Sequence, residues 1–270
     1  MILIGSHAMN YWVPRKCKDW DLIGNLSDVI DNGEKIEIKP PDFLDTENVL
    51  APYITQSVIT DVGVCQLPDP AGLALLKRSH LHRPIGFQKH IRDYHALKKL
   101  FTPDDDWFRR LKLRTKLTNE MFGDRHPSLR KSNDDFFYDR VPKKYVHDSI
   151  HYATSYYGTP IYERLKVDKD SAWCERDLWN NLSHEDKIKC VREEGFTISL
   201  ERKLIPAWDR GENYPPRFAF NYAVERICTT LCSGYFREFA IENWPEIIDY
   251  DWDFVTKFKE GLENGIVKYI

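Results

Sequence analysis

The sequence predicts an α+β fold: a small mixed sheet with helices over residues 1–122, then an all-helical domain over residues 123–270. Two observations support this division. Short apolar and alternating runs, the patterns typical of strands, end at Cys65. After that point, segments with the apolar period of a helix follow one another, separated by proline-containing breaks.

Composition limits the classes of function. Of the 270 residues, 42% are hydrophobic, which is enough for a substantial core. The net charge of −3 excludes a globally basic surface, so a nucleic acid would have to bind a local patch. No apolar run is long enough for a membrane span. The six cysteines form no C-x-x-C pair, and no signal peptide precedes them, so we expect free thiols in a cytoplasmic protein.

The first predicted strand, residues 1–4, is a short apolar run that ends at Gly5-Ser6. A helix can begin at this break, which puts Gly5 and Ser6 at a strand-to-helix corner. Such a corner directs backbone N–H groups outward, an arrangement that suits a phosphate.

Asp19 and Asp21 flank Trp20 in the second predicted strand. The two-residue period of a strand places both carboxylates on one face. Because Mg²⁺ is usually bound through one or two carboxylates plus substrate phosphates, this pair beside an anion-binding corner predicts a metal-bound nucleotide.

The third predicted strand is the alternating run 35–39, which stops at two prolines. Glu37 within it is a candidate third carboxylate, and the alternative is a solvent-facing strand residue. A capped helix over 45–53 and a β-rich stretch over 58–65 are predicted next.

The order strand, Gly5-Ser6, a helix of about two to three turns, then Asp19-Trp20-Asp21 resembles the signature of the nucleotidyltransferase superfamily typified by DNA polymerase β. The resemblance implies that Asp19 and Asp21 bind Mg²⁺, that Gly5 and Ser6 hold the terminal phosphates, and that Glu37 is a metal ligand or base.

Amphipathic helices are predicted over 71–80 and 87–101. The runs 71–78 and 89–97 look similar to motifs of abortive-infection and toxin-type nucleotidyltransferases. This likeness implies that Lys77 holds triphosphate charge and that Asp93 supports the site. Alternatively, Lys77 is a surface residue and Asp93 pairs with Lys89 four residues earlier on its helix.

Segment 109–130 is basic, and we consider it either a solvated helix face joining the two domains or a nucleic-acid surface. Its basic residues include Arg109, Arg110, Lys112, Arg114, Lys116, Arg125 and Arg130. The polar residues 123–139 indicate the boundary between the halves. Beyond it, helices are predicted over 143–157, 161–165, 171–182, 184–204, 218–243 and 252–261.

A second constellation lies in the helical half. His147 and His151, at i and i+4, share a helix face, and the helix beginning at His184 adds Glu194. These residues could ligate a metal, and His147-Asp148 weakly resembles the HD-type phosphohydrolases. The structural alternative is a set of partly buried polar residues paired across helices.

We therefore expect a Mg²⁺-dependent nucleotidyltransferase that moves a nucleoside monophosphate from a nucleoside triphosphate to an acceptor hydroxyl on a nucleic acid, protein or small molecule. One alternative is a metal-dependent phosphohydrolase centred on His147, His151 and Glu194. The other is a non-catalytic nucleotide- or nucleic-acid-binding protein with the same fold.

Overall fold

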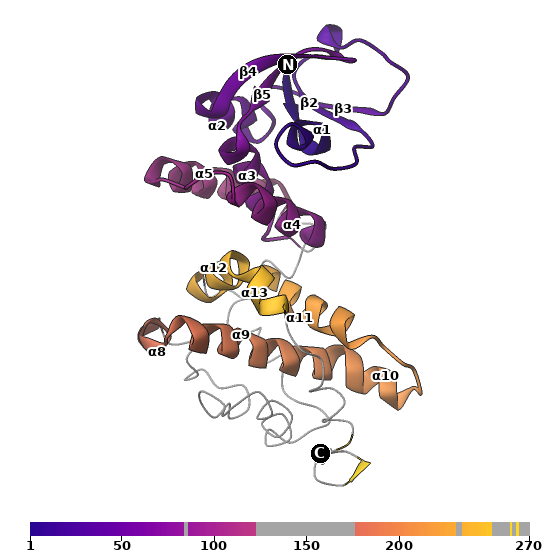
Figure 1. The fold of residues 1–270 in the computed structure, drawn as a ribbon, viewed down its shortest axis with the longest axis vertical. Coiled ribbons are helices and arrows are strands. Elements are labelled where there is room, and N and C mark those ends of the chain that lie inside the picture. The colour runs from indigo at the N-terminus through magenta and orange to yellow at the C-terminus, as the bar shows by residue number, and fades with distance from the viewer. Residues whose placement is uncertain (84–85, 123–175, 231–233, 250–259, 261–262, 265–270) are drawn as a thin grey trace. The chain divides into compact units, whose positions relative to one another are not determined.

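The computed structural model describes residues 1–83, 86–122, 176–230, 234–249, 260 and 263–264. The chain divides into two compact units, Met1–His126 and Pro127–Ile270 (Figure 1). The first unit combines a mixed five-stranded sheet with helices, and the described part of the second consists of helices. The predicted α+β class is therefore confirmed.

The sheet has the strand order β3-β2-β1-β5-β4. Its central strand β1 is antiparallel to β2 and parallel to β5, while β2 is parallel to β3 and β4 is antiparallel to β5. The Gly5-Ser6 corner directly after β1 therefore lies next to β2, which carries Asp21. The strands are β1 (Ile2–Ile4), β2 (Trp20–Ile23), β3 (Ile36–Lys39), β4 (Ile54–Thr60) and β5 (Gly63–Pro68).

The β-rich stretch 58–65 spans the turn of a hairpin between β4 and β5. The Thr60 hydroxyl donates to the carbonyl of Gly63 (2.8 Å) and accepts from the N–H of Val62 (3.3 Å). These local bonds stabilise a tight turn inside a run whose composition alone favours a continuous strand.

Two helices of the first unit begin within two residues of the end of a strand: α1 follows β1, and α3 follows β5. Asp69 caps α3 by accepting from the N–H of Gly72 (2.8 Å), and Pro70 occupies its first position. Leu50 and Leu76 pack on Ile2 and Ile23 in the core. The helices are α1 (Gly5–Asn10), α2 (Thr46–Leu50), α3 (Pro70–Arg78), α4 (Phe87–Lys98) and α5 (Asp105–Phe122), with 3₁₀ turns over Leu26–Asp28, Phe43–Asp45 and Ala51–Tyr53. The helix α1 is thus shorter than predicted.

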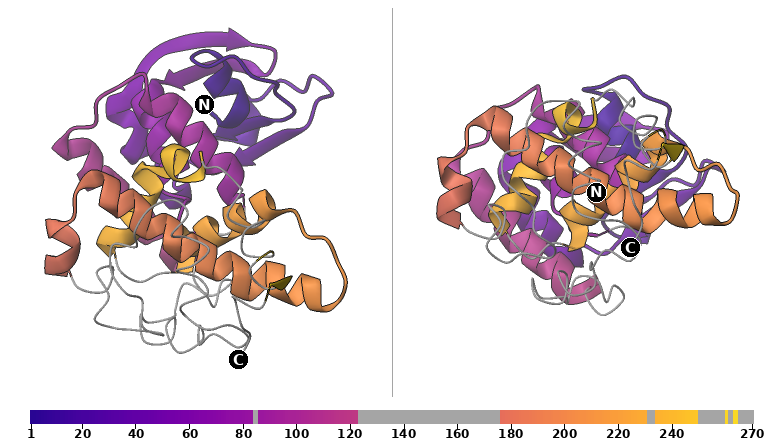
Figure 2. Two further views of the ribbon diagram at one scale, coloured as in Figure 1. Left: turned by 60° about the horizontal axis from the view of Figure 1, so that its bottom comes forward. Right: turned by 90° about the horizontal axis from the view of Figure 1, so that it is seen from below.

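In the second unit, α9, a π-helical segment and α10 follow one another in one direction (Figure 2). The helix α11 packs along α9, where the rings of Phe196 and Phe220 lie 4.8 Å apart between centroids. The helices are α8 (Arg176–Asn181), α9 (His184–Ser199), the π-helix Leu200–Leu204, α10 (Ile205–Asp209), α11 (Pro216–Thr230), α12 (Gly234–Glu242) and α13 (Trp244–Ile248). The helices predicted over 143–157 and 161–165 lie outside the described residues.

Candidate functional site

Gly5 and Asp21 are brought together by the antiparallel pairing of β1 with β2. Ile4, the last residue of β1, is the register partner of Asp21. Gly5 follows with φ +68°, in the left-handed region, and a Cβ placed on it would lie 1.8 Å from Asp21 Oδ2. Both the backbone conformation and the close approach of the carboxylate therefore require glycine at this position.

Ser6 is the second residue of α1 and follows Gly5 directly. Its side chain is buried, with 5% exposed, and its hydroxyl oxygen has no hydrogen-bond partner among the described residues. The Cys17 thiol donates to the Ser6 carbonyl (3.4 Å), which brings the segment before β2 next to the Gly5-Ser6 corner. The hydrogen-bonding capacity of this buried hydroxyl is therefore unused among the described residues.

The carboxylates of Asp19, Asp21 and Glu37 lie on one side of the β2–β3 pair. Asp21 is the parallel register partner of Glu37. The Lys35 ammonium lies 3.7 Å from Asp19 Oδ2 and 2.9 Å from Glu37 Oε1, so it joins the other two carboxylates. Trp20 is buried, stacks on the His7 ring (3.7 Å between centroids) and donates its indole N–H to Glu34.

Burial raises the pKa of the Asp21 carboxyl, and the charges of Asp19 and Glu37 raise it further. The positive charges of Lys77 and Lys89 oppose this shift. The ionised form of Asp21 is therefore less favoured than that of an ordinary aspartate, as expected for a group that a bound cation would stabilise.

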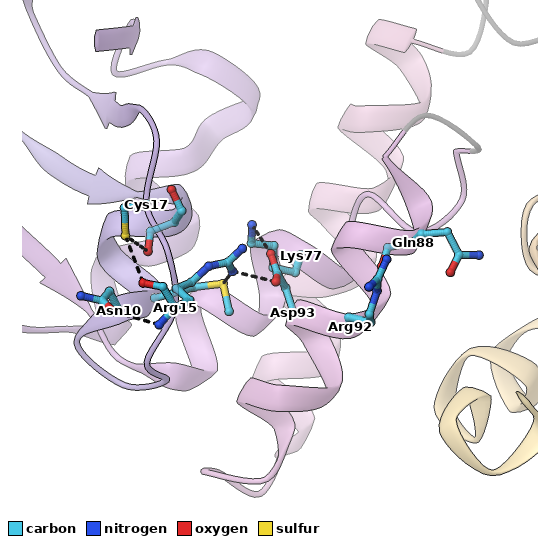
Figure 3. Close-up of polar contacts among 9 residues, drawn as sticks. Asn10, Arg15, Cys17, Lys77, Gln88, Arg92 and Asp93 are labelled. Carbon is cyan, nitrogen blue, oxygen red and sulfur yellow. Dashed lines mark hydrogen bonds and ion pairs between the residues drawn. The ribbon is translucent and has the colours of Figure 1, made fainter. Parts of the chain in front are cut away.

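Asp93 joins two cations from distant parts of the chain (Figure 3). Its Oδ2 lies 2.9 Å from the Lys77 ammonium at the end of α3, and its Oδ1 lies 2.7 Å from the Arg15 guanidinium. The side chains of Lys77 and Asp93 are 9% and 10% exposed. Burial lowers the pKa of Lys77, while the Asp93 carboxylate opposes that shift. The ion-pair partners of Asp93 in the described residues do not include Lys89, so that alternative is wrong.

Arg15 was not among the predicted site residues. It lies in the irregular segment between α1 and β2, 78 residues from Asp93 in the chain. A single arginine among basic neighbours belongs to no periodic pattern that would predict a role for it. Its partner is identified only by the packing of α4 beside this segment.

Segment 109–130 is only partly available as a basic surface. Arg109 and Arg110 both bind the Asp106 carboxylate. Arg114 is buried and donates to the Leu44 carbonyl and the Thr46 hydroxyl, at 2.7 Å each. Burial lowers the pKa of Arg114 to about 10. The two hydrogen bonds from Arg114 support the backbone at Leu44 and Asp45, which have left-handed conformations. Because Arg114 is buried, it cannot contact a nucleic acid. Lys112 and Lys116 are exposed, whereas Arg125 and Arg130 lie outside the described residues.

The alternative metal site is described only in part. His147 and His151 lie outside the described residues, and Glu194 is buried, with 2% exposed. Within the described ranges, no group of three or more His, Cys, Asp or Glu side chains is arranged to hold a metal ion. Two carboxylates plus substrate phosphates are a usual set of Mg²⁺ ligands, and Asp19 and Asp21 fit that set.

None of the described helices is long and apolar enough to cross a membrane. Two family models match the chain: one described as Domain of unknown function (DUF7275) over residues 72–260, and one described as Domain of unknown function (DUF7277) over residues 1–56. No curated protein and no solved structure matches the chain. The candidate site draws Gly5, Arg15, Asp19, Asp21 and Glu37 from one matched segment and Lys77 and Asp93 from the other.

Proposed function

We propose that this chain, which belongs to the DUF7275 family, is a Mg²⁺-dependent nucleotidyltransferase whose site is built from β1, β2, β3, α3 and α4. One observation supports this most. The Asp21 carboxylate lies against the Gly5 backbone and beside two further carboxylates, and burial among these negative charges raises its pKa. A divalent cation would neutralise the repulsion among these carboxylates, and an anionic ligand could complete the coordination of that cation.

In the proposed reaction, an acceptor hydroxyl attacks the α-phosphorus of a nucleoside triphosphate. A new oxygen–phosphorus bond forms, the bond to the β-phosphate oxygen breaks, and pyrophosphate leaves. Asp19 and Asp21 would hold Mg²⁺. When bound, Mg²⁺ neutralises charge on the phosphates and orients the reacting oxygens. Glu37 is the proposed acceptor of the hydroxyl proton, because it is the third carboxylate on this side of the sheet.

Phosphate groups would be held by the Gly5-Ser6 corner and by Lys77. The Gly5-Ser6 corner offers backbone N–H groups and the buried Ser6 hydroxyl, which has no partner in the described residues. Lys77 acts on Asp21 electrostatically and is the proposed cation for the outer phosphates. The acceptor could include a nucleic acid bound through the exposed Lys112 and Lys116 of α5.

The test is to incubate the protein with Mg²⁺ and each of the four nucleoside triphosphates labelled on the α-phosphate, in the presence of cell RNA, DNA or protein. We expect label to appear in one acceptor fraction, and Asp21→Asn to abolish this transfer. The matched control is Asp28→Asn, which changes an exposed aspartate of the same unit and should transfer normally.

Two outcomes would contradict the proposal. Transfer that survives in Asp21→Asn would exclude this site. Tight nucleotide binding without transfer to any fraction would instead support the non-catalytic alternative.

A further inference from the structure

We propose that Arg15 is a positioning residue of the nucleotide site and acts through Asp93. This inference rests on the proposed function. Arg15 lies four residues before Asp19, in the segment that connects α1 to β2, and its guanidinium binds Asp93 on α4 at 2.7 Å. The same carboxylate binds Lys77 at 2.9 Å. Asp93 therefore couples the segment leading to the proposed metal ligands with the proposed phosphate-binding lysine.

Arg15 is held at several points, which makes its position well defined. Its backbone N–H donates to Asn10 Oδ1 (3.0 Å), and its Nη1 also contacts Met9 Sδ (2.9 Å) (Figure 3). Its side chain is only 21% exposed. A planar guanidinium fixed in this way determines where the Asp93 carboxylate lies and restricts the segment before Asp19.

The charges around Asp93 distinguish two roles for it: positioning Lys77 and Arg15, or acting on a bound anion only through its own charge. One carboxylate binds two cations, which leaves one net positive charge in a largely buried group. If Asp93 mattered only through its charge, removing that charge would leave two cations and would strengthen the binding of an anion. If Asp93 positions Lys77 and Arg15, removing the charge must weaken binding, because both cations lose their fixed partner.

The first measurement is the affinity for ATP and GTP, each with Mg²⁺, by calorimetry. We expect Asp93→Asn and Arg15→Gln to weaken the better-bound nucleotide about 10- to 100-fold, as loss of a supporting partner does at other metal sites. Arg15→Lys, which keeps the charge, should recover part of this loss.

The matched control is Arg92→Gln. Arg92 precedes Asp93 on α4, but its side chain is exposed, points away from Asp93 and donates to the Gln88 carbonyl (2.8 Å) (Figure 3). Arg92→Gln removes one positive charge, as Arg15→Gln does, and removes it from the helix that carries Asp93, so it should leave affinity within about twofold of wild type. Unchanged or tighter binding in Asp93→Asn, or an equal loss in Arg92→Gln, would overturn the proposal.

A second measurement needs no nucleotide and separates this inference from the proposed function. Amide hydrogen exchange over residues 11–19 should accelerate in Arg15→Gln and Asp93→Asn, but not in Arg92→Gln, because only the first two release that segment. If wild type binds no nucleotide, the proposed function fails, while accelerated exchange would still support positioning of the segment by Arg15 and Asp93. Unchanged exchange in both variants would overturn the positioning role.

Discussion

Asp21 Oδ2 occupies the space beside Gly5 in which the Cβ of any other residue would lie. The contact follows from the pairing of Ile4 with Asp21, and from the left-handed backbone of Gly5 directly after β1. It makes the Gly5-Ser6 corner and the Asp19-Trp20-Asp21 strand parts of one site, although 13 residues separate Ser6 from Trp20.

Gly5→Ala should both destabilise the first unit and displace the Asp21 carboxylate. The left-handed backbone alone costs about 1–3 kcal/mol for a residue with a Cβ, and the clash with Asp21 adds to this. Urea unfolding measures the loss. The control is Gly33→Ala, at φ +77° with no atom within 4 Å of its Cβ, which bears only the backbone cost. Equal losses in the two variants would show that the Asp21 contact is unimportant.

Asp21→Asn should raise the free energy of unfolding at neutral pH. Because folding raises the pKa of Asp21, the ionised carboxylate destabilises the folded state at pH values above its folded pKa. This penalty shrinks as pH falls, and it disappears below the unfolded pKa of ~4, where both states are protonated. Thermal unfolding of wild type and variant should therefore differ at pH 7 and converge towards pH 4. A variant less stable than wild type at pH 7 would contradict this expectation.

Lys77→Met should weaken the binding of nucleoside triphosphates more than that of nucleoside monophosphates. In the proposed function, its ammonium faces the outer phosphates, which a monophosphate lacks. The variant leaves Asp93 paired with Arg15, so the carboxylate keeps one partner. Calorimetry with ATP and AMP provides the comparison. An equal loss of affinity for ATP and for AMP would show that Lys77 does not act on the outer phosphates.

Arg114→Met should destabilise the first unit by roughly a few kcal/mol, because the Leu44 carbonyl and the Thr46 hydroxyl both lose a buried donor. The control is Lys112→Met on the exposed side of the same helix, which should change stability by less than about 0.5 kcal/mol. Urea unfolding monitored by tryptophan fluorescence measures both. If the two variants were equally stable, Arg114 would not be the support of the Leu44–Asp45 backbone.

Much of the first unit could be predicted because its signals are local. The apolar run before Gly5, the alternation around Glu37 and the proline at the start of α3 each indicate an element through its own residues. The hairpin of β4 and β5 was missed, since its β-branched residues favour a strand and the turn depends on the Thr60 hydroxyl. Arg114 was wrongly grouped with the surface charges, because its neighbours in sequence are exposed and its burial depends on packing against Leu44.

By itself, the sequence determined which residues are available for chemistry: the glycine and serine after β1, the two aspartates on either side of Trp20 at the start of β2, and the glutamate in β3. Local spacing is sufficient for this, because the two-residue period of a strand assigns side chains to faces. Only the tertiary structure decided that Asp93 binds Arg15 as well as Lys77, and that Asp21 lies on Gly5. These contacts join residues up to 78 positions apart, and such distances in the chain leave no periodic signal; strand register and helix packing bring the partners together.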